Sequence, residues 1–221
     1  MAIAIPIATG EVLAGTGFIA GTQGGTFAIV TALHLLGRST DIRIGFPPHG
    51  GNVASPQTYP SPSMPALPAK LVLTEFLYDL AILLVRNPGL NAPVPRYIFD
   101  PAEIGVGEEV LVVGYPFAPI GSMLETVEPC CVSAIGRRLR PHGGSLDELI
   151  LSHQTHPGSS GSPVVRKSDG AVCGIVRGCL APPGVLSIGN LPIGTDTNVT
   201  YATTAHILPA LLSEAFAIGV E

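Results

Sequence analysis

The chain has 221 residues, of which 46% are hydrophobic and 12% are charged, and its formal net charge at pH 7 is −5. That length is enough to bury a core, either as one large domain or as two small ones. A negatively charged chain lacks the basic face that nucleic-acid binding needs, and without an apolar run of about 18 residues it has no helix that crosses a membrane.

The first six residues do not form a signal peptide. No basic residue precedes their apolar run, which ends at Pro6, too early for the hydrophobic region of such a peptide. We therefore expect a cytoplasmic protein.

Residues 15–20 and 26–31 are two apolar strands separated by a glycine-rich loop, a pattern that predicts a β-hairpin. The second strand leads directly to His34. A single histidine among leucines is often a hydrogen-bonded core residue. It can also be a general base, because the pKa of a free imidazole, about 6.5, lies close to physiological pH.

Residues 47–68 are rich in proline, serine and glycine and predict an extended surface loop, either a lid over a substrate or an excursion between strands. The apolar segment 77–85 follows and contains Asp79. Burying an unpaired carboxylate is costly, so Asp79 is expected to have a hydrogen-bonded or cationic partner. It could instead cap a helix, but this short run closes at residues 87–89, which favours a strand.

The second half of the chain continues with segments that resemble strands, at residues 110–116, 128–136, 145–151, 171–176 and 200–204. Only residues 206–217 have the spacing of a helix with one apolar side. We expect that helix to pack against the second half of the chain. The one basic cluster, Arg137, Arg138 and Arg140, is interpreted as a solvated hairpin end.

The four cysteines, at positions 130, 131, 173 and 179, are too few for a disulfide framework in a chain of this size. They do not have the spacing of a zinc site either. We expect buried free thiols, no metal and no other cofactor.

Residues 155–163 read Thr-His-Pro-Gly-Ser-Ser-Gly-Ser-Pro and lie between the apolar runs 149–151 and 164–165. This composition is typical of an ordinary surface turn. It also suits a nucleophile loop, in which two buried strands hold Ser160 at a tip and glycines allow a tight bend. The backbone amides of Gly158 and Ser160 could then converge on an oxyanion.

His34, Asp79 and Ser160 occur in the order of the chymotrypsin template, each at the edge of an apolar strand. Residues 31–34 resemble the threonine-alanine-x-histidine block of trypsin-like serine peptidases. Residues 79–83 resemble their aspartate-leucine-alanine block, and residues 158–163 are similar to their nucleophile block.

Further segments are similar to the compact bacterial branch of this family, which includes the high-temperature-requirement (Deg) peptidases. They are residues 15–19, 106–108, 113–116 and 172–176. The resemblance extends from about residue 15 to residue 208. Three blocks in the correct order make it more specific than any single block.

The resemblance implies an all-β fold of two packed antiparallel six-stranded β-barrels, chymotrypsin-like, with a C-terminal α-helix. Residues 1–100 would form the barrel that carries His34 and Asp79. Residues 101–221 would form the barrel that carries Ser160, together with the helix. The active site would lie in the cleft between the barrels.

The resemblance also implies a serine endopeptidase that acts on a polypeptide substrate. Ser160 would attack the scissile carbonyl and form a covalent acyl-enzyme, while His34 takes up its proton and later passes it to the leaving amine. Asp79 would orient His34 and stabilise its cation. The amides of Gly158 and Ser160 would form the oxyanion hole.

Three departures from the family pattern carry expectations. Ser159 replaces the aspartate that pairs with a freed N-terminus in zymogen-activated trypsins, so no such switch is expected. Ser162 replaces a commoner glycine and places three hydroxyls close together. The chain ends at Glu221, so we expect no peptide-binding module of the Deg type, and any regulatory partner is left open.

The resemblance places Gln154, six residues before Ser160, at the base of the primary substrate pocket. Thr155 follows it, and Val176, Arg177 and Gly178 would form one wall. A neutral base disfavours arginine or lysine in the substrate, because no carboxylate would pair the incoming cation. Small or medium uncharged side chains are expected there.

Two other functions compete with this interpretation. A non-peptidase acyl hydrolase could combine Ser160 with Asp196 and His206, but residues 158–162 do not fit the Gly-x-Ser-x-Gly elbow of that class. A binding module with the peptidase fold and a silent site is also open. The presence of all three triad residues disfavours it.

Overall fold

The computed structural model describes residues 2–6, 12–37, 39, 41–46, 56–57, 66–86, 95–97, 100–120, 123–139, 144–154, 156, 158–179, 187–188, 191–192 and 199–219. Most of the loop predicted over residues 47–68 lies outside this part of the chain. Its last three residues belong to a strand rather than to the loop.

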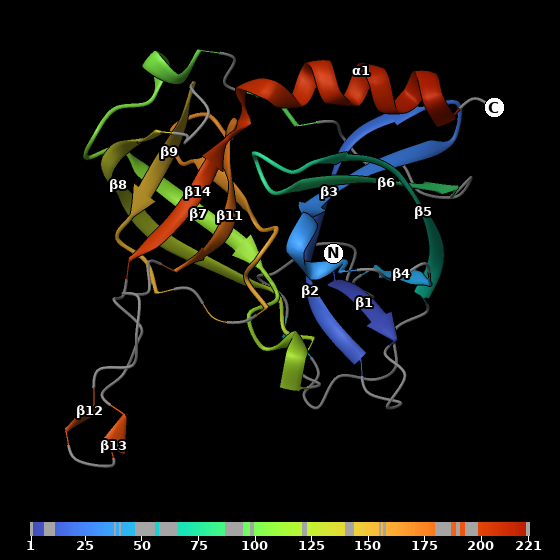
Figure 1. Cartoon of the computed structure of the whole chain (residues 1–221), viewed down its shortest axis with the longest axis horizontal. Helices are drawn as coiled ribbons and strands as arrows, with labels where there is room; N and C mark the ends of the chain where they lie inside the picture. The colour runs from blue at the N-terminus through green and yellow to red at the C-terminus, as the bar shows by residue number, and fades with distance from the viewer. Residues whose placement is uncertain are drawn as a thin grey trace.

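Six antiparallel strands close into the first barrel, in the spatial order β1, β2, β3, β6, β5, β4 (Figure 1). Their bounds are Ala2–Pro6 (β1), Val12–Gln23 (β2), Thr26–Ala32 (β3), Ile42–Gly45 (β4), Ala66–Glu75 (β5) and Leu80–Arg86 (β6). Strands β3 and β6 are apolar without alternation because both of their faces are buried. Phe27, Ile29 and Leu83 fill the barrel, whereas Val30 and Ile82 belong to a second cluster shared with the other barrel.

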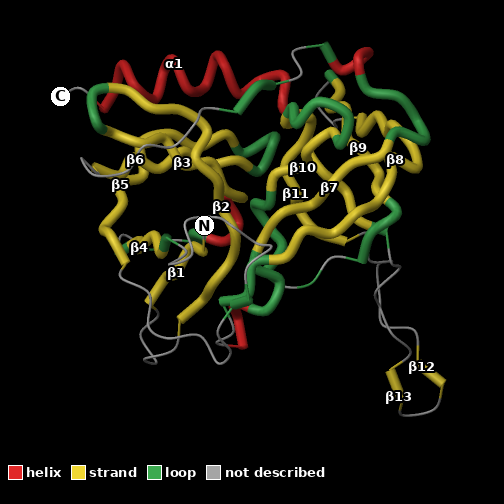
Figure 2. Tube along the Cα trace, turned by 180° about the vertical axis from the view of Figure 1, so that it is seen from behind, coloured by secondary structure: helices red, strands yellow, loops and turns green. Residues whose placement is uncertain are grey.

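Six further antiparallel strands close into the second barrel, in the order β10, β11, β14, β9, β8, β7, and the two barrels lie side by side (Figure 2). Their bounds are Glu109–Gly114 (β7), Thr126–Leu139 (β8), Ser145–Leu151 (β9), Pro163–Arg166 (β10), Val172–Cys179 (β11) and Thr200–Thr204 (β14). Strands β12 (Ser187–Ile188) and β13 (Leu191–Pro192) form a separate small hairpin. The predicted fold class of two six-stranded barrels is confirmed.

Short 3-10 helices connect the strands at Leu33–Leu35 (η1), Pro101–Glu103 (η2), Ala118–Ile120 (η3) and Ala205–Ile207 (η4). The chain then enters its one α-helix among the described residues, α1, Leu208–Gly219. This helix begins two residues later than the sequence indicates. No helix in the described part of the chain combines the length and the apolar character that crossing a membrane needs.

Helix α1 lies across the first barrel, so the expected packing against the second half of the chain is wrong (Figure 1). Its buried side chains, Leu212 and Ala215, join Ala28 and Leu84 of the first barrel in one apolar cluster. Leu208, at the start of the helix, belongs to the same cluster, as do Val172 and Ile175 of β11. An amphipathic stripe specifies that a helix is covered but not which surface covers it.

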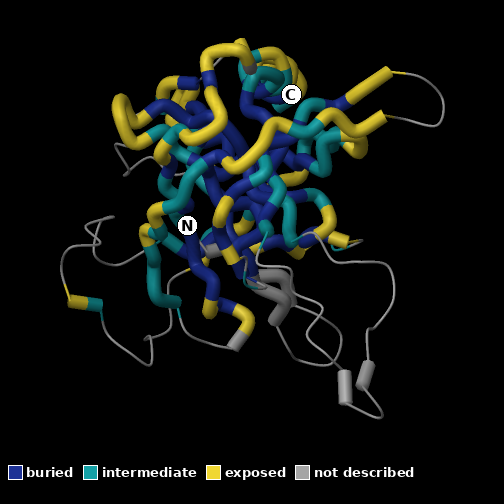
Figure 3. Tube along the Cα trace, turned by 90° about the vertical axis from the view of Figure 1, so that its left-hand side faces the viewer, coloured by how far each residue is buried: buried dark blue, intermediate teal, exposed yellow. Residues whose placement is uncertain are grey.

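Buried segments gather at the centre of the molecule, beneath exposed loops (Figure 3). None of the four cysteines forms a disulfide, as expected, but only Cys173 is buried and the other three are partly exposed. The basic residues Arg137 and Arg138 lie on exposed positions of β8, opposite Asp147 and Leu146 of β9, which agrees with a solvated hairpin.

Candidate active site

Antiparallel pairing of β3 with β6 brings His34 and Asp79 together. Ala32, at the end of β3, lies opposite Leu80, at the start of β6, so the next residue out on each side meets across the gap. The amide of Leu33 donates to the Asp79 carbonyl at 2.9 Å. The amide of His34 donates to Oδ1 of Asp79, also at 2.9 Å. The backbone thus orients the Asp79 carboxylate independently of the imidazole.

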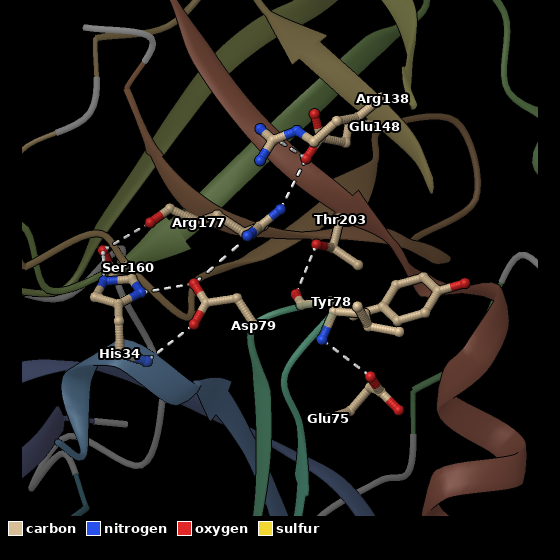
Figure 4. Close-up of polar contacts among 10 residues, drawn as sticks. His34, Glu75, Tyr78, Asp79, Arg138, Glu148, Ser160, Arg177 and Thr203 are labelled. Atoms are coloured by element: carbon tan, nitrogen blue, oxygen red, sulfur yellow. Dashed lines mark hydrogen bonds and ion pairs between the residues drawn. The ribbon is translucent and has the colours of Figure 1, made fainter. Parts of the chain in front are cut away.

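The imidazole makes the second contact with this carboxylate. His34 Nδ1 lies 2.7 Å from Asp79 Oδ2 (Figure 4). Side-chain exposure is 46% for His34 and 15% for Asp79, so the carboxylate is covered and the ring is open on one side. Both of these contacts of the Asp79 carboxylate are with His34, which is therefore the hydrogen-bonding partner that the sequence predicted for this residue.

Asp79 closes the turn of residues 76–79 between β5 and β6, with a φ of 56°. Few side chains adopt this left-handed conformation, and aspartate is one of those that do. The alternative of a helix cap is therefore wrong, because the residue precedes a strand. The carboxylate of Asp79 also lies 3.6 Å from Arg177 Nε of the second barrel.

Ser160 lies in a buried loop rather than in a surface turn, and the residues of 158–162 are all buried. Its Oγ is 3.1 Å from His34 Nε2 and 3.2 Å from the carbonyl oxygen of Arg177. The neighbouring serines are engaged elsewhere: Ser159 Oγ accepts from the His156 amide, and Ser162 Oγ is buried without a hydrogen-bond partner. Of the three hydroxyls, that of Ser160 faces the imidazole.

Backbone amides around Ser160 differ in their hydrogen bonds. The amides of Ser159, Gly161 and Ser162 each donate to a carbonyl. Within the described residues, the amides of Gly158 and Ser160 donate to none. Two amides two residues apart are thus available beside the Ser160 hydroxyl, as an oxyanion hole requires.

Thr16 of β2 ties this loop to the first barrel. Its amide donates to the Ser160 carbonyl at 3.1 Å, and its hydroxyl donates to the Gly158 carbonyl at 2.8 Å. The same hydroxyl accepts from the Tyr115 amide at 2.9 Å. Thr16 is 1% exposed, so these bonds are shielded from water. Its role was not predicted, and the position of a threonine between two glycines was the only signal.

Glycine is required at two positions of the loop by close backbone contacts. A Cβ on Gly158 would lie 2.1 Å from the Tyr115 carbonyl oxygen, and a Cβ on Gly161 would lie 2.1 Å from that of Thr16. Gly161 also has a φ of 84°. The loop is therefore pressed against its supports on both sides.

The residues expected to bind substrate are placed in different surroundings. Gln154 is exposed, Gly178 is half-buried, and Thr155 lies outside the described residues. Val176 is buried, and its amide and carbonyl bond to Ser162 and Gly161 of the loop. The Arg177 side chain is turned away from Ser160, toward Asp79 and Glu148 (Figure 4).

Burial perturbs two other side chains near the loop. His153 is 7% exposed, and the loss of solvation lowers its pKa, although Glu128 at 3.5 Å opposes the shift. Burial raises the pKa of Tyr115, and the Glu125 carboxylate adds to that effect. The described residues contain no group of histidine, cysteine and carboxylate side chains that could hold a metal ion.

Comparisons with known proteins agree with this fold. The model of the trypsin-like peptidase domain family matches residues 15–175. The active form of the Rv3671c protease from M. tuberculosis is similar over 99% of this chain and 79% of its own, with 22% identity and a TM-score of 0.68. The HtrA-type protease AlgW, solved with a decapeptide, is similar over 94% of this chain, with 20% identity and a TM-score of 0.64.

This chain covers 53% of the AlgW chain, so it corresponds to about half of that protein. At these identities the solved structures establish the shared fold alone. A sequence search among curated proteins gives no match.

Proposed function

Because the chain belongs to the trypsin-like peptidase domain family, we propose that this serine endopeptidase hydrolyses peptide bonds through Ser160, His34 and Asp79. One observation carries the proposal. A relay of contacts joins Ser160 Oγ to His34 Nε2 at 3.1 Å and His34 Nδ1 to Asp79 Oδ2 at 2.7 Å. A nucleophile, a base and an orienting carboxylate within hydrogen-bond reach are the requirement for this chemistry.

Acylation begins when His34 takes the proton of Ser160 as the hydroxyl attacks the scissile carbonyl. The hydroxyl has one proton and two acceptors within reach, His34 Nε2 and the Arg177 carbonyl. Transfer requires the proton to point to His34. The carbonyl carbon becomes tetrahedral, and its oxygen gains negative charge that the free amides of Gly158 and Ser160 stabilise.

The leaving amine takes the proton from His34, and an ester between Ser160 and the substrate remains. Water then attacks that ester, again with His34 as base, and releases the second product. Asp79 keeps the imidazole in the tautomer with a proton on Nδ1 and stabilises the imidazolium. Because the backbone amide of His34 bonds the same carboxylate, ring and carboxylate move as one unit.

We also propose how the loop reaches this arrangement without propeptide cleavage. The Ser159 hydroxyl accepts from the amide of His156, which is a bond within the loop itself. Thr16 supplies the remaining support from β2. A freed N-terminus has no carboxylate to pair with at position 159.

The substrate is proposed to be a polypeptide with a small or medium uncharged side chain next to the scissile bond. Gln154, Thr155, Val176, Arg177 and Gly178 would line its path. Since the guanidinium of Arg177 is engaged elsewhere, this residue would contribute its backbone. The cytoplasmic location and bacterial origin stay predictions from the sequence.

A fluorophosphonate probe tests the proposal, because it reacts with an activated serine. We expect the wild-type protein to be labelled on Ser160 and the Ser160→Ala variant to remain unlabelled. His34→Ala should slow labelling by about 100-fold or more. Ser162→Ala is the matched control, since its buried hydroxyl has no partner to lose. Wild-type protein that is unlabelled throughout pH 6 to 9, or labelling that survives Ser160→Ala, would contradict the proposal.

A further inference from the structure

Arg177 is the extra residue of a β-bulge in β11. Val176 pairs with Ala202 of β14 and Gly178 pairs with Tyr201, so Arg177 has no partner in the ladder. Bulges turn a side chain out of the regular alternation and are frequent beside active sites. Here the bulge sends the Arg177 carbonyl to the Ser160 hydroxyl and its guanidinium to Asp79 (Figure 4).

The guanidinium is a partly buried cation between two carboxylates. Its side chain is 12% exposed. Nη1 donates to Glu148 Oε1 at 2.8 Å, and Nε lies 3.6 Å from Asp79 Oδ2, the oxygen that contacts His34. The Nε atom is buried and forms no hydrogen bond. Its interaction with Asp79 is therefore electrostatic.

The second barrel fixes this cation in place. Glu148 of β9 is 7% exposed at its side chain and also pairs with Arg138 Nη2 at 3.1 Å. The guanidinium carbons of Arg138 and Arg177 each lie 5.4 Å from the centre of the Tyr201 ring. The two arginines share the single carboxylate of Glu148, so the cluster keeps a net positive charge. The Arg177 end of the cluster faces the triad.

Resting on the function proposed above, we propose that Arg177 is a positioning residue. From the second barrel, its guanidinium holds the Asp79 carboxylate in place and offsets part of the negative charge of that carboxylate. Activity should therefore persist to lower pH than it would without this cation. In acylation His34 becomes a cation on one side of the Asp79 carboxylate, whose Oδ2 faces this guanidinium on the other side. A fixed positive charge 3.6 Å from Asp79 Oδ2 favours the negative carboxylate and disfavours a second positive charge beside it.

The charged and titratable groups around Asp79 come from every packed element. They are His34 on η1, Arg177 on β11, Glu148 on β9 and Arg138 on β8. Glu75 ends β5 and accepts from the Leu77 amide, and His206 of η4 contacts the Tyr78 ring edge to face. Of the arginines and lysines, only Arg177 is in contact with the Asp79 carboxylate within the described residues.

The test measures the rate constant of fluorophosphonate labelling between pH 5 and 9. Arg177→Met removes the cation, and the acid limb should move to higher pH by about 0.5 to 1 unit. Glu148→Gln leaves the cation less neutralised, and the limb should move in the opposite direction. Arg177→Lys keeps the charge and should retain the wild-type midpoint, with a lower maximal rate because the forked contact is lost.

Arg137→Met is the matched control, because it removes the same charge from the same sheet while Arg137 pairs with Asp147, remote from Asp79. Its pH profile should equal that of the wild type. If Arg177→Met lowers the maximal rate without moving the limb, or if both variants move it in one direction, Arg177 is only structural and the inference fails. An unlabelled wild-type protein would instead overturn the proposed function. If Arg177→Met does not fold, the pH profiles of Glu148→Gln and Arg177→Lys test the inference in its place.

Discussion

Thr16→Val tests whether the first barrel supports the nucleophile loop. Valine has the shape of threonine but removes the hydroxyl that bonds the Gly158 carbonyl at 2.8 Å and the Tyr115 amide at 2.9 Å. Both groups would then be buried without that partner, each at a cost of about 1 to 3 kcal/mol. We therefore expect the free energy of unfolding to fall by about 2 to 6 kcal/mol.

Urea unfolding at pH 7 measures this loss, and fluorophosphonate labelling of the folded variant reports on the loop. Thr16→Ser is the matched control, since it keeps both hydrogen bonds and loses only one methyl group, at about 1 kcal/mol. Labelling should slow in Thr16→Val and not in Thr16→Ser. If Thr16→Val unfolds within about 0.5 kcal/mol of the wild type and is labelled at the same rate, the support from β2 is not needed.

Three further predictions concern residues around the site. Gly161→Ala forces a Cβ to 2.1 Å from the Thr16 carbonyl at a φ of 84° and should lower the free energy of unfolding, measured by thermal melts, by about 2 to 4 kcal/mol. The control is Gly170→Ala, which has a φ of 72° and open space around it and should lose about 1 kcal/mol in the same melts. Burial lowers the pKa of His153. Below about pH 6.5 the unfolded chain therefore binds a proton at this histidine more readily than the folded protein does, and the free energy of unfolding falls as the pH drops from 7 to 5. His153→Gln should flatten that fall, and an unchanged slope in urea melts would refute it. Burial raises the pKa of Cys173 to about 12, so iodoacetamide at pH 8 should modify this thiol only after unfolding; mass spectrometry that finds it modified in native protein would contradict the expectation.

The family resemblance supplied the fold and the pair His34 and Asp79, and local signals around the two residues agree with it. Strands β3 and β6 are largely apolar runs, and pairing Ala32 with Leu80 places Leu33 beside Asp79, with His34 the next residue along the chain. The turn that carries Asp79 needs a left-handed residue, and aspartate supplies one.

The surroundings of Arg177 could not be predicted in this way. Its contacts depend on a bulge in β11 and on the register that places Glu148 opposite Thr203 of β14, and neither leaves a mark in the composition. The family resemblance placed Arg177 in the substrate wall, and it gave no indication that the guanidinium lies 3.6 Å from the Asp79 carboxylate.

Thr16 illustrates the same limit over a longer range. Its bond to Gly158 joins residues 142 positions apart, and no local pattern reports a contact of that separation. The packing of α1 was mistaken for a related reason, because the helix follows the second barrel in sequence but covers the first.

The most direct test of the central claim is to trap the acyl-enzyme. The protein is mixed with p-nitrophenyl acetate, quenched in acid, digested and mapped by mass spectrometry. Attack by Ser160 releases p-nitrophenolate and leaves an acetyl ester on its Oγ. We predict one acetyl group on Ser160 in the wild type and in Ser162→Ala, and none in Ser160→Ala. An acetyl group on another residue, or equal turnover by Ser160→Ala, would contradict the account.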